Sequence, residues 1–238
     1  MRQPFARMVA AEGQVFFGWK VVAVAFVVTT FTWGIGLYGL SIFVGEIERI
    51  RGWSVTLVSA AVTCNMLIGA PVFAKLPALH ARYGVARITQ AGAILTALGL
   101  VGWAVAAEPW QLFAVTPLTG AGWAMTSGAA ANAIVSPWFD QRRPAALSMA
   151  MNGSSVGGII FSPLFVFLIA SFGLRAAAVM VGSATAIMVV LLSARYLAPT
   201  PAGLGLQVDN GVVLQAAANA HQPALQPIAH GGWWRDRR

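Results

Sequence analysis

Four polar side chains inside long apolar stretches are the residues of this sequence best suited to chemistry: Tyr38, Asn65, Asn132 and Asn152. Each carries a hydroxyl or an amide that needs a hydrogen-bond partner, because an unpaired polar group in an apolar environment is costly. A solute or water in a polar cavity is one such partner and a neighbouring helix is another, so both interpretations stay open. The three histidines of the chain do not group with acids. The pattern therefore favours binding over catalysis, and predicts neither an enzyme nor a metal site nor a cofactor.

Six charge-free stretches carry these residues. Each is long enough for an α-helix to cross a hydrocarbon core of ~30 Å at ~1.5 Å per residue. Charged residues make up 9% of the chain, whereas an ordinary globular domain contains ~25%. We therefore expect an all-α membrane protein with six transmembrane helices that form one half of a larger bundle. The stretches are residues 21–45, 52–74, 88–107, 109–139, 144–174 and 176–194.

The predicted organisation of the chain has three parts. A cytoplasmic segment covers residues 1–18, the six-helix bundle residues 19–196, and a flexible, proline-containing cytoplasmic linker or tail residues 197–238. The last eight residues, 231–238, combine two tryptophans with three arginines, and either lie on the membrane surface or have no regular structure. The spans are expected at about residues 19–44, 55–73, 88–106, 111–136, 144–172 and 176–195, with a cytoplasmic loop over residues 75–87.

Basic residues are distributed unevenly between the two ends of these predicted spans. Twelve would lie on one side and three, Arg49, Arg51 and Arg175, on the other. An excess of lysine and arginine marks the cytoplasmic side, so both termini are expected in the cytoplasm of a bacterial inner membrane. The formal net charge of +8 does not indicate nucleic-acid binding, because the basic residues flank the spans and do not cover one soluble face.

Small residues concentrate in the fifth predicted span. Gly153, Gly157 and Gly158 let another helix approach closely, either for ordinary packing or so that this helix can move against a partner. No charged residue lies in the middle of any predicted span. Because proton-coupled or anion-selective transport usually needs an intramembrane acid or base, such a group would have to come from another polypeptide or another segment.

A motif between the fourth and fifth spans gives the sequence a family resemblance. Residues 138–146, Trp-Phe-Asp-Gln-Arg-Arg-Pro-Ala-Ala, followed by the glycines of the fifth span, resemble the signature of the major facilitator superfamily. Together with the Arg-Tyr-Gly triplet at residues 82–84, they are most similar to its monocarboxylate-transporter and oxalate/formate-antiporter branch. The resemblance implies roles in cytoplasmic gating and topology for Arg82, Gly84, Arg87, Asp140, Arg142 and Arg143.

The sequence departs from the family pattern in the loop after the second span. Ala81 stands where the family usually has an aspartate that helps to lock the cytoplasmic gate, and Pro77 replaces a glycine. The span-six entry has Leu174 where the family usually has an aromatic residue. The two loop departures, Ala81 and Pro77, bear on the strength of gating.

The resemblance implies a solute transporter that works by alternating access, with this chain as the N-terminal six-helix half and a small, monocarboxylate-like organic anion as the solute. Tyr38, Asn65, Asn132 and Asn152 are then the expected solute contacts. The lipid bilayer and the solute are the expected partners, with a second six-helix half or a second copy of this chain completing the path. The alternative is a truncated, transport-inactive fragment or a scaffold subunit that pairs with another membrane polypeptide.

Overall fold

The computed structural model describes residues 16–211 of the chain. The tail segment 231–238, predicted either to lie on the membrane or to lack regular structure, is outside this range. The first predicted span is one continuous helical run of α2 (Phe17–Trp33), the π-helical η1 (Gly34–Gly39) and α3 (Leu40–Arg51). It ends at Gly52, whose φ of +68° is a left-handed conformation that glycine adopts without strain.

The second and third spans are joined by a turn that is much shorter than predicted. Helix α4 (Val55–Tyr83) continues to residue 83, and α5 (Val85–Val105) begins after Gly84 alone. The prediction of a loop over residues 75–87 is therefore wrong. Leu76 is fully buried in a cluster with side chains of α5 and α7, and this tertiary packing stabilises the helix beyond the end of its charge-free stretch.

The fourth predicted span is interrupted. Helix α6 (Pro109–Thr126) ends at Ser127, which has extended backbone angles of φ −73° and ψ −170°, and α7 (Gly128–Val135) follows. Glu108 and Gln111 form a capping box at the start of α6, which satisfies its first backbone N–H groups. The short loop predicted after this span is present between α7 and α8 (Arg143–Met151).

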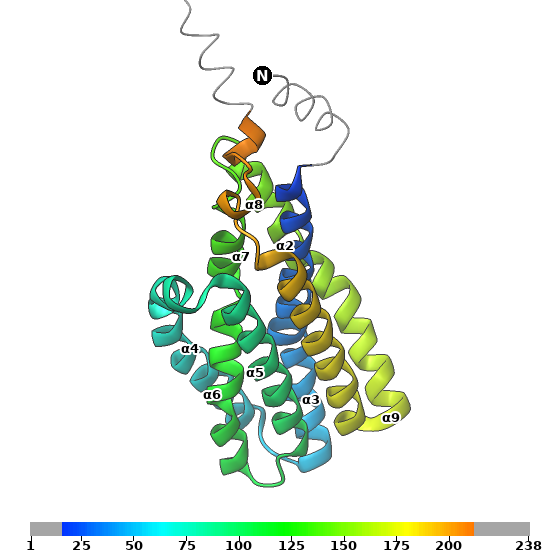
Figure 1. Cartoon of the computed structure of the whole chain (residues 1–238). Helices are drawn as coiled ribbons and strands as arrows, with labels where there is room; N and C mark the ends of the chain where they lie inside the picture. Colours follow the sequence, from blue (N-terminus) through cyan, green and yellow to red (C-terminus); the bar gives the residue numbers. More distant parts are fainter. Residues whose placement is uncertain (1–15, 212–238) are drawn as a thin grey trace, which may run out of the picture.

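Helix α9 (Gly153–Leu192) contains a break at Gly173, where φ is +80° and ψ is 166°. Figure 1 shows that the chain reverses direction there, so that α9 has two arms. The break lies next to Phe172, the predicted end of the fifth span. A π-helical turn, η2 (Ser193–Leu197), follows the second arm.

All regular secondary structure in residues 16–211 is helical, as predicted. Four helical runs in this range are long and apolar enough to cross a membrane, compared with six predicted stretches. The two α9 arms belong to one of these runs, and the interrupted α6–α7 segment is not among them. The four runs are Phe17–Arg51, Val55–Tyr83, Val85–Val105 and Arg143–Leu197.

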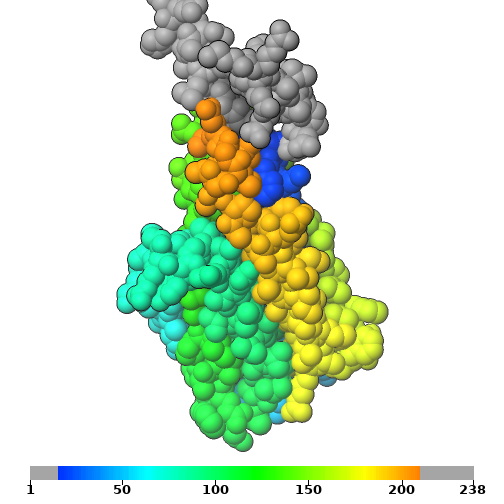
Figure 2. Space-filling view, in the orientation of Figure 1, coloured from blue at the N-terminus to red at the C-terminus, as the bar shows by residue number. Residues whose placement is uncertain are grey.

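Helices pack closely along two seams that depend on glycine. Along the first, α6 lies against α4, and a Cβ on Gly69 would stand 2.8 Å from the carbonyl oxygen of Gly120. Along the second, α9 lies against α2 and η1, and a Cβ on Gly157 would stand 2.9 Å from the backbone nitrogen of Gly34. Figure 2 shows the second arm of α9 beside α5 along one face of the bundle. The bundle is therefore held by backbone approach as well as by side-chain packing.

The beginning of the predicted flexible tail is folded. It contains two short 3₁₀ helices, η3 (Ala202–Leu204) and η4 (Val208–Gly211). Leu206 packs against a cluster that includes the buried Val21 of α2 and Trp138 of the α7–α8 loop. These apolar contacts explain why this part of the tail folds although its proline content predicted flexibility.

Candidate functional site

An open groove of about 430 Å³ runs between the first helical run and α4. Three hydroxyl groups lie among its otherwise apolar side chains, and none of the lining residues is charged. Two of the hydroxyls already donate to their own helices: Ser41 Oγ to Leu37 O and Thr63 Oγ1 to Ser59 O, both at 3.1 Å. These oxygens can still accept hydrogen bonds from a solute. The groove is lined by Gly36, Leu37, Leu40, Ser41, Val44, Ser59, Val62, Thr63 and Met66.

The π-helical segment η1 forms one wall of this groove. Its glycines leave room for aromatic rings from other helices: Phe161 lies against Gly34, and Trp123 lies against Gly36. Trp33, just before η1, also meets Trp123, with ring centroids 5.2 Å apart. Single π-helical turns occur frequently at functional sites, and here one lies in the middle of the first span.

The predicted helix-packing glycines face this first span. Gly153 lies against Thr30, and Gly157 lies against the backbone of Thr30 and Gly34. A Cβ on Gly158 would stand 2.7 Å from Cζ of Tyr38, so the tyrosine ring covers this glycine. Tyr38 is half-buried at the α9 seam and is not among the groove-lining residues.

The structure does not bring the three predicted asparagines together. Asn65 is 3% exposed and lies away from the groove, against α6. Asn152 is exposed between α8 and α9. Asn132 is exposed on α7, where its Oδ1 accepts a hydrogen bond of 2.9 Å from Nη2 of Arg143. Within the described residues, the Asn132–Arg143 pair is the one side-chain hydrogen bond that joins two of the predicted residues.

The other predicted gating residues lie at the loops. Arg82, Arg87, Asp140 and Arg142 are exposed. The guanidinium of Arg82 lies 5.2 Å from the ring centroid of its neighbour Tyr83. Gly84, also exposed, has a φ of +85° and forms the tight α4–α5 turn. Within the described residues these arginines form no ion pair with a carboxylate, so the structure shows no charge lock at this end.

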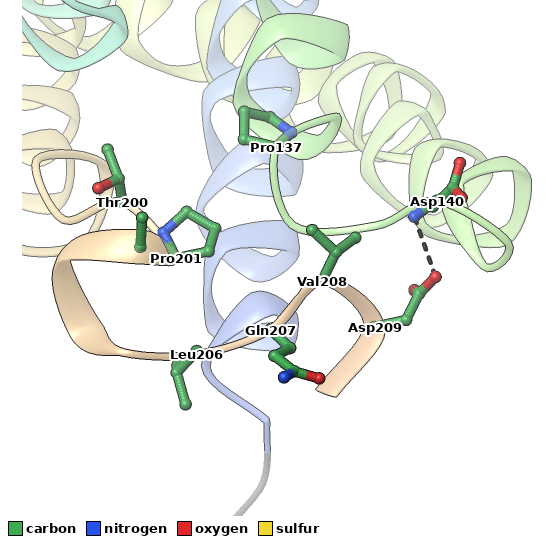
Figure 3. Close-up of a pocket in the computed structure, with 9 residues that line it drawn as sticks. Pro137, Asp140, Thr200, Pro201, Leu206, Gln207, Val208 and Asp209 are labelled. Atoms are coloured by element: carbon green, nitrogen blue, oxygen red, sulfur yellow. Dashed lines mark hydrogen bonds between the residues drawn. The ribbon is translucent and has the colours of Figure 1, made fainter. Parts of the chain in front are cut away.

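A residue that the sequence did not single out, Asp209, connects the tail to the α7–α8 loop. Its Oδ2 accepts hydrogen bonds from the backbone N–H groups of Asp140, at 3.0 Å, and Gln141, at 2.8 Å. Its own N–H donates to the carbonyl oxygen of Trp138 at 3.1 Å. Asp209 is 3% exposed, with a φ of +52°. Figure 3 shows its carboxylate directed at the Asp140 backbone. No motif in the sequence signals this contact, because it joins residues almost seventy positions apart.

Removing this carboxylate should release the tail from the loop. A hydrogen bond to a charged acceptor contributes about 1.5–3 kcal/mol, so Asp209→Ala should speed amide exchange at Gln141 by about tenfold or more. Hydrogen–deuterium exchange with mass spectrometry measures this rate. Asp140→Ala is the matched control, since its exposed side chain makes no hydrogen bond within the described residues. Equal exchange in wild type and Asp209→Ala would contradict the docking role.

The family described as Major Facilitator Superfamily matches residues 14–231. Monocarboxylate transporter 11 of Mus musculus is 31% identical over 173 residues, which are 71% of this chain and 37% of that protein. Monocarboxylate transporter 13 of Rattus norvegicus is 28% identical over 170 residues, which are 70% of this chain and 39% of that protein. Monocarboxylate transporter 3 of Mus musculus is 30% identical over 161 residues, which are 66% of this chain and 32% of that protein.

These comparisons confirm the resemblance drawn from the sequence motifs. The relatives are named as transporters, which confirms that this chain is not an enzyme. The family and the apolar helices together make it an integral, multi-pass membrane protein. The chain spans between about a third and two fifths of the length of these relatives.

Proposed function

Because the chain belongs to the major facilitator superfamily, we propose that it forms the N-terminal, six-helix half of a secondary transporter. In this proposal it moves a small, monocarboxylate-like organic anion by alternating access, as two helix bundles rock about a site near the middle of the membrane. The observation that carries the proposal is the uncharged groove beside η1. Its volume lies within the range of ~300–1,000 Å³ that small-molecule sites occupy.

The lengths of the helices support the proposal of six membrane crossings. At ~1.5 Å per residue α9 would extend about 60 Å, twice the ~30 Å hydrocarbon core, if it were straight. Its reversal at Gly173 supports two crossings by α8–α9. Helices α6 and α7 together extend about 40 Å and support one further crossing despite the interruption at Ser127.

The orientation that fits this arrangement places both termini in the cytoplasm. Residue 16 at the start of α2 and the η4 segment lie at the same end of the bundle as α8 in Figure 1. The α7–α8 loop at that end contains Arg142 and precedes Arg143, whereas Arg175 follows the α9 reversal at the opposite end. The excess of basic residues thus marks the cytoplasmic side.

The groove supports solute binding but not the neutralisation of an anion. Its hydroxyl oxygens and apolar walls can orient a small organic molecule, while the compensating positive charge must come from outside the groove. A second six-helix half, or a second copy of this chain, is the proposed source. Arg143, held by Asn132 near the loop, is the proposed first contact for a carboxylate on the cytoplasmic side.

Uptake by proteoliposomes tests the proposal. The protein is purified from its native membranes together with any partner, and uptake of labelled lactate is measured under a proton gradient. Ser41→Leu should lower uptake at least tenfold, because leucine fills the groove. Ser183→Leu is the matched control: Ser183 is also exposed and also donates to its own helix, to Met180 O at 3.1 Å, but it lies on α9 away from the groove.

Two outcomes would reject the proposal. If wild-type preparations move neither lactate nor another small carboxylate, the chain does not transport this class of solute. If the two leucine variants lose uptake equally, the groove is not the solute path. Absence of uptake would favour the alternative of a transport-inactive scaffold subunit.

A further inference from the structure

A second, much smaller cavity lies beside η1. Its volume is about 20 Å³, and its lining includes Gly36 and Leu40, which also line the groove. The remaining walls come from α4, α5 and α6. The cavity is lined by Ile35, Gly36, Leu40, Asn65, Thr96, Leu100, Trp103, Thr119 and Trp123.

Three of these lining residues have a buried polar atom without a hydrogen-bond partner among the described residues: Oδ1 of Asn65, Oγ1 of Thr96 and Nε1 of Trp103. Their exposed fractions are 3%, 7% and 2%. Seven such atoms occur in the described part of the chain, so nearly half of them belong to this one small cavity. Buried polar atoms are normally paired, and their concentration here points to a shared ligand.

The three groups are chemically complementary to water. The asparagine oxygen only accepts, the indole N–H only donates, and the threonine hydroxyl does either. A water molecule that accepts from Trp103 and donates to Asn65 satisfies both, and Thr96 can take either role. Buried waters typically make about three hydrogen bonds to groups of this kind.

The small volume of the cavity admits a water molecule but not the proposed solute. A cavity needs roughly 10–15 Å³ to hold one water molecule, and this one offers about 20 Å³. The groove beside η1 is about 430 Å³, so a carboxylate with a carbon skeleton fits there and not here. Asn65 lines this small cavity and does not line the groove.

We propose that this small cavity is a specific binding site for one internal water molecule, held by Asn65, Thr96 and Trp103 between α4 and α5. The water supplies partners to groups that would otherwise be unpaired in a segment surrounded by lipid. In this proposal Asn65 binds water and does not contact the solute directly. The inference stands independently of the identity of the solute.

Nuclear magnetic resonance of the full chain with ¹⁵N-labelled tryptophan tests this site. The indole signal of Trp103, assigned by its loss in Trp103→Phe, should show a magnetisation-transfer peak to long-lived water although the side chain is buried. Trp110, which is 67% exposed, provides the reference for contact with bulk water. Asn65→Leu removes the acceptor and fills the cavity, so the Trp103 water peak should disappear and the Trp103 signal should shift.

The matched control is Asn152→Leu, which changes the same residue type at an exposed position and should leave the Trp103 water peak intact. Thr96→Val is a second variant that should weaken the peak, and it keeps the test decisive if Asn65→Leu does not fold. A wild-type Trp103 signal without a water peak would overturn the proposal. A peak of undiminished intensity in both folded cavity variants would overturn it as well.

Discussion

Replacing Gly120 by alanine is expected to destabilise the bundle strongly, and replacing it by leucine should prevent the α4–α6 seam from forming. A Cβ added to Gly120 would face backbone atoms of α4. It would stand 3.2 Å from the nitrogen of Gly69 and even closer to the carbonyl oxygen of Asn65. Backbone atoms cannot move aside as a flexible side chain can. Overpacking usually costs 1–3 kcal/mol, and we expect about 3 kcal/mol or more here. Thermal unfolding in detergent should show Tm lower by about 10 °C.

Gly45 provides the matched control for this substitution. It lies inside α3, and no heavy atom stands within 4 Å of the position that its Cβ would occupy. Gly45→Ala should therefore leave Tm unchanged or raise it, because alanine is favoured over glycine in a helix by about 1 kcal/mol. If Gly120→Ala and Gly45→Ala have the same Tm, the close approach of α4 and α6 is not required for stability.

The sequence predicts the helical class and the positions of the long apolar helices because lipid imposes a simple rule on composition. A charge-free stretch of sufficient length must satisfy its backbone hydrogen bonds internally, and a helix does so. The rule says little about where a helix ends outside the hydrocarbon layer. The continuation of α4 to Tyr83 accompanies burial of Leu76 by other helices, and the folded start of the tail is held by the apolar contacts of Leu206 and the hydrogen bonds of Asp209. Both are tertiary effects that no local pattern reports.

The candidate site was harder to predict than the fold. The sequence signal for the site was the presence of isolated polar residues in apolar stretches. This signal located Asn65 and Asn132 but did not indicate the environment of either side chain. Asn65 lines a small internal cavity, and Asn132 lies beside Arg143 near a loop. The groove hydroxyls of Ser41 and Thr63 resemble many helical serines and threonines that bond to their own backbone. Helix rotation and the π-helical turn at η1 decide these environments, and neither follows from residue type.

If the proposed transport is correct, Arg143→Lys should weaken the binding of a carboxylate at the cytoplasmic side. The KM for lactate efflux from oriented vesicles should rise at least tenfold. One guanidinium N–H of Arg143 is bonded to Asn132, which holds the planar group in place. The remaining N–H groups can bind a carboxylate in a bidentate geometry that lysine cannot reproduce. Asn132→Ala should shift KM in the same direction by a smaller factor, because the charge remains but its position is lost.

The neighbouring Arg142→Lys separates this role from an effect of charge on membrane topology. Arg142 is exposed and makes no side-chain hydrogen bond within the described residues, so the same substitution there should change KM less than twofold. Both variants keep the positive charge that orients the bundle, and any difference between them therefore reports on geometry. Equal KM values for Arg143→Lys and wild type would remove Arg143 from the solute path. Equal losses in the two lysine variants would instead indicate that the loop as a whole is disturbed.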